Sequence, residues 1–190
     1  MPTLLILCLT GGVWAGGSPA AAQDAEGWFI EGNRLSAQGR FEDAVEAYQR
    51  SIRLNPRSPA AYYNLGIAYK NLEAYEQAVQ AFENTLELEP FNLDARVSLG
   101  NIYNLQEKWE KAIGQLNIVV HRRRNDAQAH GNLGWAYYNY PGKPSFEFLT
   151  ILNLRKAVDL FEAQGQNQAA ESTRKVLEEA LRKFGRQGKN

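Results

Sequence analysis

The chain has 190 residues, and its 21 Lys and Arg residues balance 21 Asp and Glu residues, so its formal net charge is zero. This balance argues against a nucleic-acid-binding protein, because such proteins depend on clustered positive charge. The single cysteine, Cys8, lies within the first 22 residues, so the rest of the chain offers no thiol for a disulfide, a nucleophile or a metal site.

The first 22 residues contain no charged side chain. Leu4 to Leu9 form an apolar core, and Ala20-Ala21-Ala22 ahead of Gln23 resembles a signal-peptide cleavage site. We therefore expect an exported protein, located in the periplasm, in the thylakoid lumen or outside the cell. The alternative is that residues 1–22 remain attached and serve as an N-terminal membrane anchor.

The remaining chain predicts helices, because apolar residues recur at spacings of three and four, as in Tyr62, Leu65 and Tyr69. Prolines at 56 and 90 end helices at the residues before them. Two prolines and a glycine at 141–144 predict a loop. The predicted helices are 24–38, 41–54, 59–71, 75–88, 93–106, 109–122, 127–140, 145–164 and 167–184.

These helices repeat with a period of 34 residues. Gly32, Gly66, Gly100 and Gly134 are evenly spaced, and an alanine follows each of the first three glycines by twelve residues. A repeat of this length predicts a stack of similar helix pairs rather than a single central core.

The second unit carries the clearest motif, with Tyr62, Leu65, Gly66, Tyr69, Ala78, Phe82 and Pro90. This pattern resembles the tetratricopeptide repeat, whose signature is W-x2-L-G-x2-Y, then A-x3-F, then P. The resemblance implies an all-α, right-handed superhelical solenoid of helix–turn–helix repeats with a C-terminal capping helix. We expect a repeat domain at 23–185, with units at about 25–58, 59–92, 93–126 and 127–165. An insertion is expected near 141–151, the cap at 167–184 and a disordered tail at 186–190.

Two registers compete for the end of the fourth unit. In the first, Ala157 and Phe161 fill the Ala and Phe positions after an insertion of eleven residues. In the second, residues 163–165 repeat the Ala-Gln-Gly of 37–39, and Ala170 takes the Ala position of a degenerate fifth unit. We prefer four units followed by a capping helix, because residues 167–184 are apolar along one stripe only.

The resemblance also implies a binding groove, since in this family the first helix of each unit lines the concave face. Aromatic and amide side chains there suit an extended peptide or a partner helix. The family's clamp for acidic chain ends is incomplete, because Phe29, Asp94 and Ser98 replace its cations while Asn33 and Asn64 match. The groove residues carried over by register are Phe29, Asn33, Tyr63, Ile67, Lys70, Asn71, Val97, Asn101, Asn104, Trp135, Tyr138 and Asn139.

A second candidate surface begins the helix after the insertion. Phe146, Phe148, Leu149 and Leu152 are too many apolar residues for one narrow stripe. Either the insertion covers them, or some of them face a partner or a membrane interface. The latter case predicts a self-associating structural module, possible as a homo-oligomer, as the alternative function.

No arrangement of residues indicates catalysis or a metal or cofactor site, and His121 and His130 lie on different predicted helices. We expect Arg122, Arg123 and Arg124 to face water at a helix end, with a phosphate or acidic-partner site as the alternative. The sequence therefore predicts a scaffold that binds a protein or peptide, without an enzymatic activity, and that assists complex assembly in an exported compartment. A membrane association is expected only if the leader stays uncut.

Overall fold

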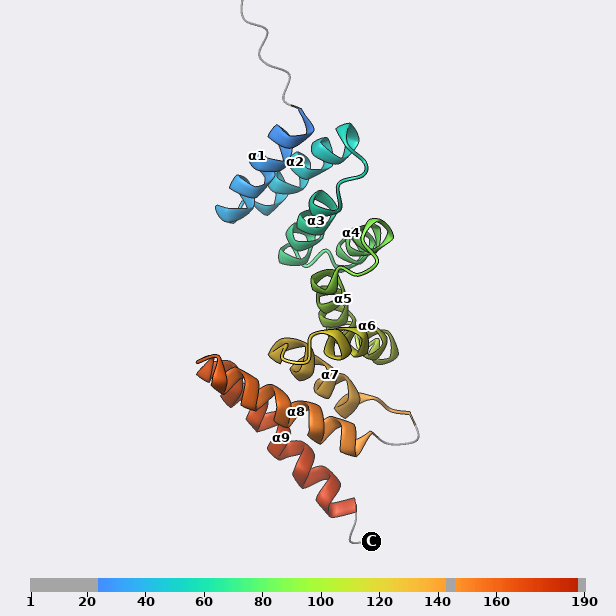
Figure 1. The fold of residues 1–190 in the computed structure, drawn as a ribbon, viewed down its shortest axis with the longest axis vertical. Coiled ribbons are helices and arrows are strands. Elements are labelled where there is room, and N and C mark those ends of the chain that lie inside the picture. The colour runs from blue at the N-terminus through green and yellow to red at the C-terminus, as the bar shows by residue number, and fades with distance from the viewer. Residues whose placement is uncertain (1–23, 143–145, 188–190) are drawn as a thin grey trace, which may run out of the picture.

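The computed structural model describes residues 24–142 and 146–187, so the predicted leader and residues 188–190 of the predicted tail lie outside the described range. The described residues form nine α-helices and no strand, stacked as successive antiparallel pairs along one axis (Figure 1). This is the all-α solenoid that the period of 34 residues predicts. The helices are α1 (Ala25–Ala37), α2 (Phe41–Leu54), α3 (Pro59–Asn71), α4 (Tyr75–Leu88), α5 (Leu93–Leu105), α6 (Trp109–Arg122), α7 (Ala127–Asn139), α8 (Glu147–Ala163) and α9 (Asn167–Gln187).

The first helix of each unit begins at a polar cap. Asp24, Ser58, Asn92 and Asp126 stand 34 residues apart, and the side chain of each accepts a hydrogen bond from the backbone N–H three residues further on. Each cap satisfies a backbone donor that the helix leaves unpaired, which stabilises the helix by about 1 kcal/mol. The repeat therefore fixes where α1, α3, α5 and α7 start.

The turn inside each unit also repeats. It passes through a left-handed residue, which is Gly39 (φ 74°), Glu73 (φ 56°) or Glu107 (φ 57°). The next backbone N–H then donates back to a carbonyl five residues earlier, as from Arg40 to Leu35 at 3.0 Å. This closure satisfies carbonyls at the end of the first helix and reverses the chain.

The two helices of a unit approach closely because small residues face large ones. A Cβ atom built on Gly32 would lie 2.5 Å from the ring of Tyr48, and one on Gly66 would lie 2.7 Å from the ring of Phe82. Tyr48 and Phe82 are almost completely buried. A larger residue at either glycine would push the helices apart, so the glycine sets their spacing.

Neighbouring units contact each other through their first helices. Contacts join α1 to α3, α5 to α7 and α7 to α9, whereas no comparable contact joins α2, α4 and α6 within the described residues. Asn64 Nδ2 donates to Asn33 Oδ1 at 2.7 Å, and Asn104 Nδ2 donates to the Asn132 carbonyl at 2.9 Å. The first helices therefore lie on the tighter, inner side of the stack.

The face of the first unit that points away from the stack is charged. Leu65, Leu99 and Leu133 are buried at equivalent positions of the later units, but Glu31 takes that position in the first. Its carboxylate pairs with Arg34 at 2.5 Å, and this bond lowers the pKa of Glu31. A charged side chain here leaves no apolar surface for a further helix to cover.

The register predicted for the fourth unit is wrong. Leu154, not Phe161, packs against Gly134, where a Cβ would lie 2.7 Å from the leucine Cγ. Sixteen residues separate Gly66 from Phe82, and twenty separate Gly134 from Leu154, so the insertion is four residues rather than eleven. Thr150 takes the Ala position and is fully buried. A threonine in that position hid the register in the sequence.

The last two helices combine features of both registers. The turn between α8 and α9 has Gly165 at φ 70°, and Gln166 N donates to the Phe161 carbonyl at 2.8 Å, as in the turns inside the earlier units. Ala170 is buried in the Ala position of a fifth unit. α8 therefore serves as the second helix of the fourth unit and as the first helix of a degenerate fifth.

The closing helix α9 runs further than predicted. It continues to Gln187, past the stop expected after Phe184, because Gly185 does not end it. Leu177 and Ala180 pack on Leu154 of α8, and the side of α9 away from α8 is largely charged. Among the helices that the structure describes, none combines the length and apolar character needed to span a bilayer.

Candidate interaction site

The predicted groove residues all lie on α1, α3, α5 and α7, but their exposure differs. Trp135 and Asn71 reach solvent, and Trp135 is 38 % exposed. Val97 and Asn104 are buried, so these two side chains are not accessible to a partner as the register predicted. The half-buried members are Phe29, Asn33, Tyr63, Ile67, Lys70, Asn101, Tyr138 and Asn139.

Several of the predicted amides already have partners within the protein. Asn33 Oδ1 accepts from the Tyr48 hydroxyl at 2.9 Å as well as from Asn64. Asn71 Nδ2 and Asn139 Nδ2 each donate to a carbonyl one turn earlier on their own helix, at 2.8 and 2.9 Å. These bonds hold the inner face in one arrangement before any partner arrives.

The aromatic residues of the first two units are anchored from behind. The ring of Phe29 lies 6.1 Å from that of Tyr48, and the ring of Tyr63 lies 5.6 Å from that of Phe82. Burial raises the pKa of Tyr63, partly offset by a hydrogen bond with Ser98. These rings offer one edge to the inner face while their bodies belong to the core.

The inner face of the fourth unit meets α9. The Tyr138 hydroxyl donates to Glu179 at 2.9 Å, and the Lys183 ammonium lies 4.3 Å from the centre of the Tyr138 ring. Burial, followed by the nearby Glu179 carboxylate, raises the pKa of Tyr138. Trp135, whose ring lies 6.0 Å from that of Tyr138, stays accessible beside this contact.

A pocket of about 300 Å³ lies between α7, α8 and α9, next to Trp135. Its walls are mostly apolar, with Gly131 on one side and Val176 on the other. No residue that lines it is ionisable at neutral pH. The lining residues are Gln128, Gly131, Asn132, Trp135, Leu154, Phe161, Ala169, Ser172, Thr173 and Val176.

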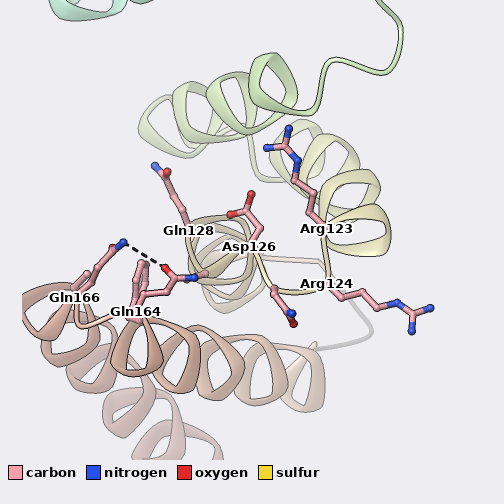
Figure 2. A pocket seen from close by; sticks show the side chains of 10 residues that line it. Arg123, Arg124, Asp126, Gln128, Gln164 and Gln166 are labelled. Atoms are coloured by element: carbon pink, nitrogen blue, oxygen red, sulfur yellow. Dashed lines mark hydrogen bonds between the residues drawn. The ribbon is translucent and has the colours of Figure 1, made fainter.

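A larger and more polar pocket of about 900 Å³ adjoins the first, because Gln128, Phe161 and Ala169 line both. Figure 2 shows it between the α6–α7 loop and the α8–α9 turn. Gln166 Nε2 donates to Gln164 Oε1 across the turn at 3.3 Å. Amide groups therefore surround this opening on the side of α8 and α9.

The three consecutive arginines do not form one cationic site. The Arg122 guanidinium lies 4.6 Å from the centre of the exposed Phe91 ring. Arg123 pairs with Asp94 at 2.5 Å, and this bond raises the pKa of Arg123. The side chain of Arg124 points away from the pocket (Figure 2). The cluster is therefore spread over three directions, as expected for solvated charges at a helix end.

The second predicted surface divides into an inner and an outer part. Phe146 and Leu149 pack against the main core, and the Phe146 ring lies 4.9 Å from that of Tyr137. Phe148 and Leu152, one turn apart on α8, are 74 % and 50 % exposed. The apolar excess at the start of α8 is thus explained in part by packing, and the rest remains on the surface.

The histidines have structural surroundings. The ring of His130 bridges Asn153 Oδ1, 2.8 Å from Nδ1, and the Arg124 carbonyl, 3.1 Å from Nε2. This bridge ties α8 to the loop before α7. His121 is exposed on α6. Over the part of the chain that the structure describes, no three His, Cys, Asp or Glu residues are grouped so that they could hold a metal ion.

Comparison with known families agrees with this geometry. Family models described as "TPR repeat" and "Tetratricopeptide repeat" match residues 32–73 and 59–92. The chain carries tetratricopeptide repeats. No curated protein matches it by sequence.

Solved tetratricopeptide structures share the fold. MamA from Desulfovibrio magneticus RS-1 is 24 % identical, with a TM-score of 0.67 over 84 % of this chain and 96 % of its own. YrrB, a tetratricopeptide protein with an unusual peptide-binding site, is 24 % identical, with a TM-score of 0.65 over 85 % and 84 %. The first repeat domain of Spaghetti (RPAP3), bound to the HSP90 peptide SRMEEVD, is 22 % identical, with a TM-score of 0.58 over 60 % and 90 %.

Register reasoning missed the residues of the pocket that come from the last two helices. Phe161 corresponds to Leu35, Tyr69 and Tyr103, because each of these accepts the backbone hydrogen bond that closes a turn. The repeated Ala-Gln-Gly at 163–165 carried this signal in the sequence. Val176, by contrast, reaches the pocket only through the packing of α9, which no repeat position specifies.

Proposed function

We propose that this protein is an interaction module that binds an extended segment or a helix of a partner protein on the inner face of its tetratricopeptide solenoid. The observation that carries the proposal is the accessible Trp135 beside an apolar pocket on α7. Buried aromatic anchors in pockets dominate the affinity of protein interfaces. The neighbours that bind peptides, YrrB and the first repeat domain of Spaghetti, support this use of the fold.

The inner face suits such a role because it is held in place before binding. Helix caps, the bonds between Asn33 and Asn64, and the contact of Asn104 with α7 fix the first helices relative to one another. A partner therefore loses its own freedom on binding but does not have to order the module. The mechanism is non-covalent recognition.

An affinity capture from the native cell with matched variants tests this proposal. Trp135→Ala and Leu105→Ser remove exposed apolar side chains from α7 and α5, where the register places both on the inner face. Ile118→Ser is the control, because Ile118 is 38 % exposed, like Trp135, but lies on α6. We expect the two inner-face variants to lose the captured partner and the control to retain it. Equal capture by all three variants would contradict the proposal.

Self-association is a second candidate function, favoured by the 74 % exposure of Phe148. Phe148 and Leu152 form an apolar strip on α8 that a second copy of the chain would bury. Light scattering measures the mass in solution directly. A dimer that Phe148→Ser and Leu152→Ser convert to a monomer supports this function, and a monomer for the unchanged protein excludes it.

We further propose that the module works in an exported compartment, where it assists assembly of a complex. This rests on the uncharged segment 1–22 and its Ala-Ala-Ala end. Fusion of residues 1–30 to a reporter that is active only after export tests the location. Size analysis of the fusion distinguishes a cleaved leader from a retained anchor.

A further inference from the structure

We propose that the pocket between α7 and α9 anchors one bulky, uncharged apolar side chain of the partner segment, and that amides at the pocket bind the main chain beside that side chain. The inference rests on the proposed function and names the partner's chemistry at one point of the inner face. The capping helix α9 is then part of the binding site, because Ala169, Thr173 and Val176 form one of its walls.

The size of the pocket limits what can enter. Its volume of about 300 Å³ lies at the lower end of ligand-binding cavities, which range over roughly 300–1,000 Å³. This is room for a single aromatic or branched aliphatic side chain. Trp135, Phe161 and Val176 supply apolar contacts around it, so a leucine, phenylalanine or tryptophan gains most from entering.

The pocket exists because α7 has no side chain at residue 131. A Cβ built there would lie 3.6 Å from the Ala157 Cβ and 3.8 Å from the Phe161 ring, which are ordinary contact distances. In contrast to Gly66 and Gly134, Gly131 is not needed for close helix packing. The space in front of it is open to the pocket.

Two buried amide atoms provide the polar part of the site. Asn132 lines the pocket, and its Nδ2 is buried without a hydrogen-bond partner among the described residues. Asn104, which is only 7 % exposed, donates to the Asn132 carbonyl, while its own Oδ1 is likewise unpartnered. One donor and one acceptor match the carbonyl and the N–H of a peptide group. Unpaired buried groups of this kind favour a ligand that pairs them.

The electrostatics select against a charged side chain. None of the ten lining residues is ionisable at neutral pH, so a carboxylate or an ammonium would enter without a counter-charge. At the adjoining polar opening, Arg123 is already paired with Asp94, and the Arg124 side chain points outward. An acidic chain end therefore finds no free cation here, and a neutral segment is favoured.

Selection from a phage-displayed library of random dodecapeptides tests the inference, with the whole chain as the target. Affinities of the selected synthetic peptides are then measured by fluorescence polarisation. Gly131→Leu places a side chain in the pocket, and Gly114→Leu is its matched control, because it makes the same change on α6 where a Cβ meets nothing within 4 Å. Asn132→Ala removes the amide, and circular dichroism verifies that each variant is folded.

We expect uncharged peptides that share one bulky apolar residue. Gly131→Leu should weaken their binding at least about tenfold, since it displaces a buried apolar side chain, and Gly114→Leu should leave it unchanged. Asn132→Ala should weaken binding by about two- to tenfold. A second pocket variant, Trp135→Ala, removes a wall without adding bulk and should also weaken binding about tenfold.

Three outcomes would overturn the inference. Selected peptides that carry a shared acidic or basic residue would show that the site reads charge. Peptides that bind Gly131→Leu as well as the unchanged protein, but lose binding in Leu105→Ser, would leave the proposed function standing and remove the pocket from it. A library that yields no peptide sensitive to either change would remove both.

Discussion

The glycines of the first helices allow a test in which one substitution has opposite effects at two positions. Gly66→Ala and Gly131→Ala both add one methyl group inside a helix. Alanine is favoured over glycine in a helix by about 0.8–1.0 kcal/mol, so both variants gain the same intrinsic term. The difference between them must come from what the new methyl group meets.

At Gly66 the methyl group would meet three atoms of the Phe82 ring, at 2.7, 2.9 and 2.9 Å. Normal carbon contacts are about 3.5–4.0 Å, so the ring must withdraw by roughly 0.7 Å. Phe82 is completely buried and packs on Tyr63, and overpacking of this kind costs about 1–3 kcal/mol. With the helix term subtracted, Gly66→Ala should lower the free energy of unfolding by about 1 kcal/mol.

At Gly131 the nearest atoms would be at 3.6 and 3.8 Å, so no overpacking offsets the helix term. Gly131→Ala should therefore raise the free energy of unfolding by about 1 kcal/mol, which corresponds to an increase in Tm of about 2–4 °C for a protein of this size. Urea titration followed by circular dichroism at 222 nm measures both variants.

Equal m-values are needed for the comparison, because repeat proteins can unfold unit by unit. If Gly66→Ala proved as stabilising as Gly131→Ala, the conclusion that glycine sets the helix spacing would be refuted.

Three further predictions concern stability. Gly39→Ala should lower the free energy of unfolding by about 1–2 kcal/mol in a urea titration, although its Cβ meets nothing within 4 Å, because the position has a φ of 74°. Thr150→Val should raise the same quantity by about 1 kcal/mol, since the buried Thr150 hydroxyl has no partner among the described residues; the control Thr85→Val, whose hydroxyl donates to Ala81 at 3.0 Å, should leave it unchanged or lower it. Burial and the nearby Glu83 raise the pKa of Tyr103 to about 12, so the stability from its neutral form is complete below about pH 10 and is lost as the pH rises towards 12. Tyr103→Phe should make the alkaline decline in urea midpoint shallower, and an unchanged decline would contradict this.

Most of the fold could be predicted because its determinants are local. The caps at Asp24 and Ser58, the turn glycine at 39 and the small-to-large pair of Gly66 and Phe82 all act within one unit, and the period displays each of them repeatedly. The register failed where the pattern itself changed. Thr150 stands in place of alanine, and only its packing shows which position it fills.

The interaction site could be predicted only in part. The register places side chains on the correct helices, but it does not report how far each is buried. Val97 and Asn104 were assigned to the groove and lie inside the protein, because neighbouring first helices approach closely enough to enclose them. The wall supplied by Val176 depends on how α9 lies against α7, which is a contact between distant segments.

The double role of α8 explains why the candidate site lies at this end of the solenoid. As the second helix of the fourth unit, α8 places Leu154 against Gly134. As the first helix of a degenerate fifth unit, it turns at Gly165 and directs α9 back across α7. Phe161, near the end of this longer helix, then faces Gly131 rather than a close-packed partner. A helix that closes the stack and a residue that leaves it open thus come together, and the result is an apolar pocket on the inner face.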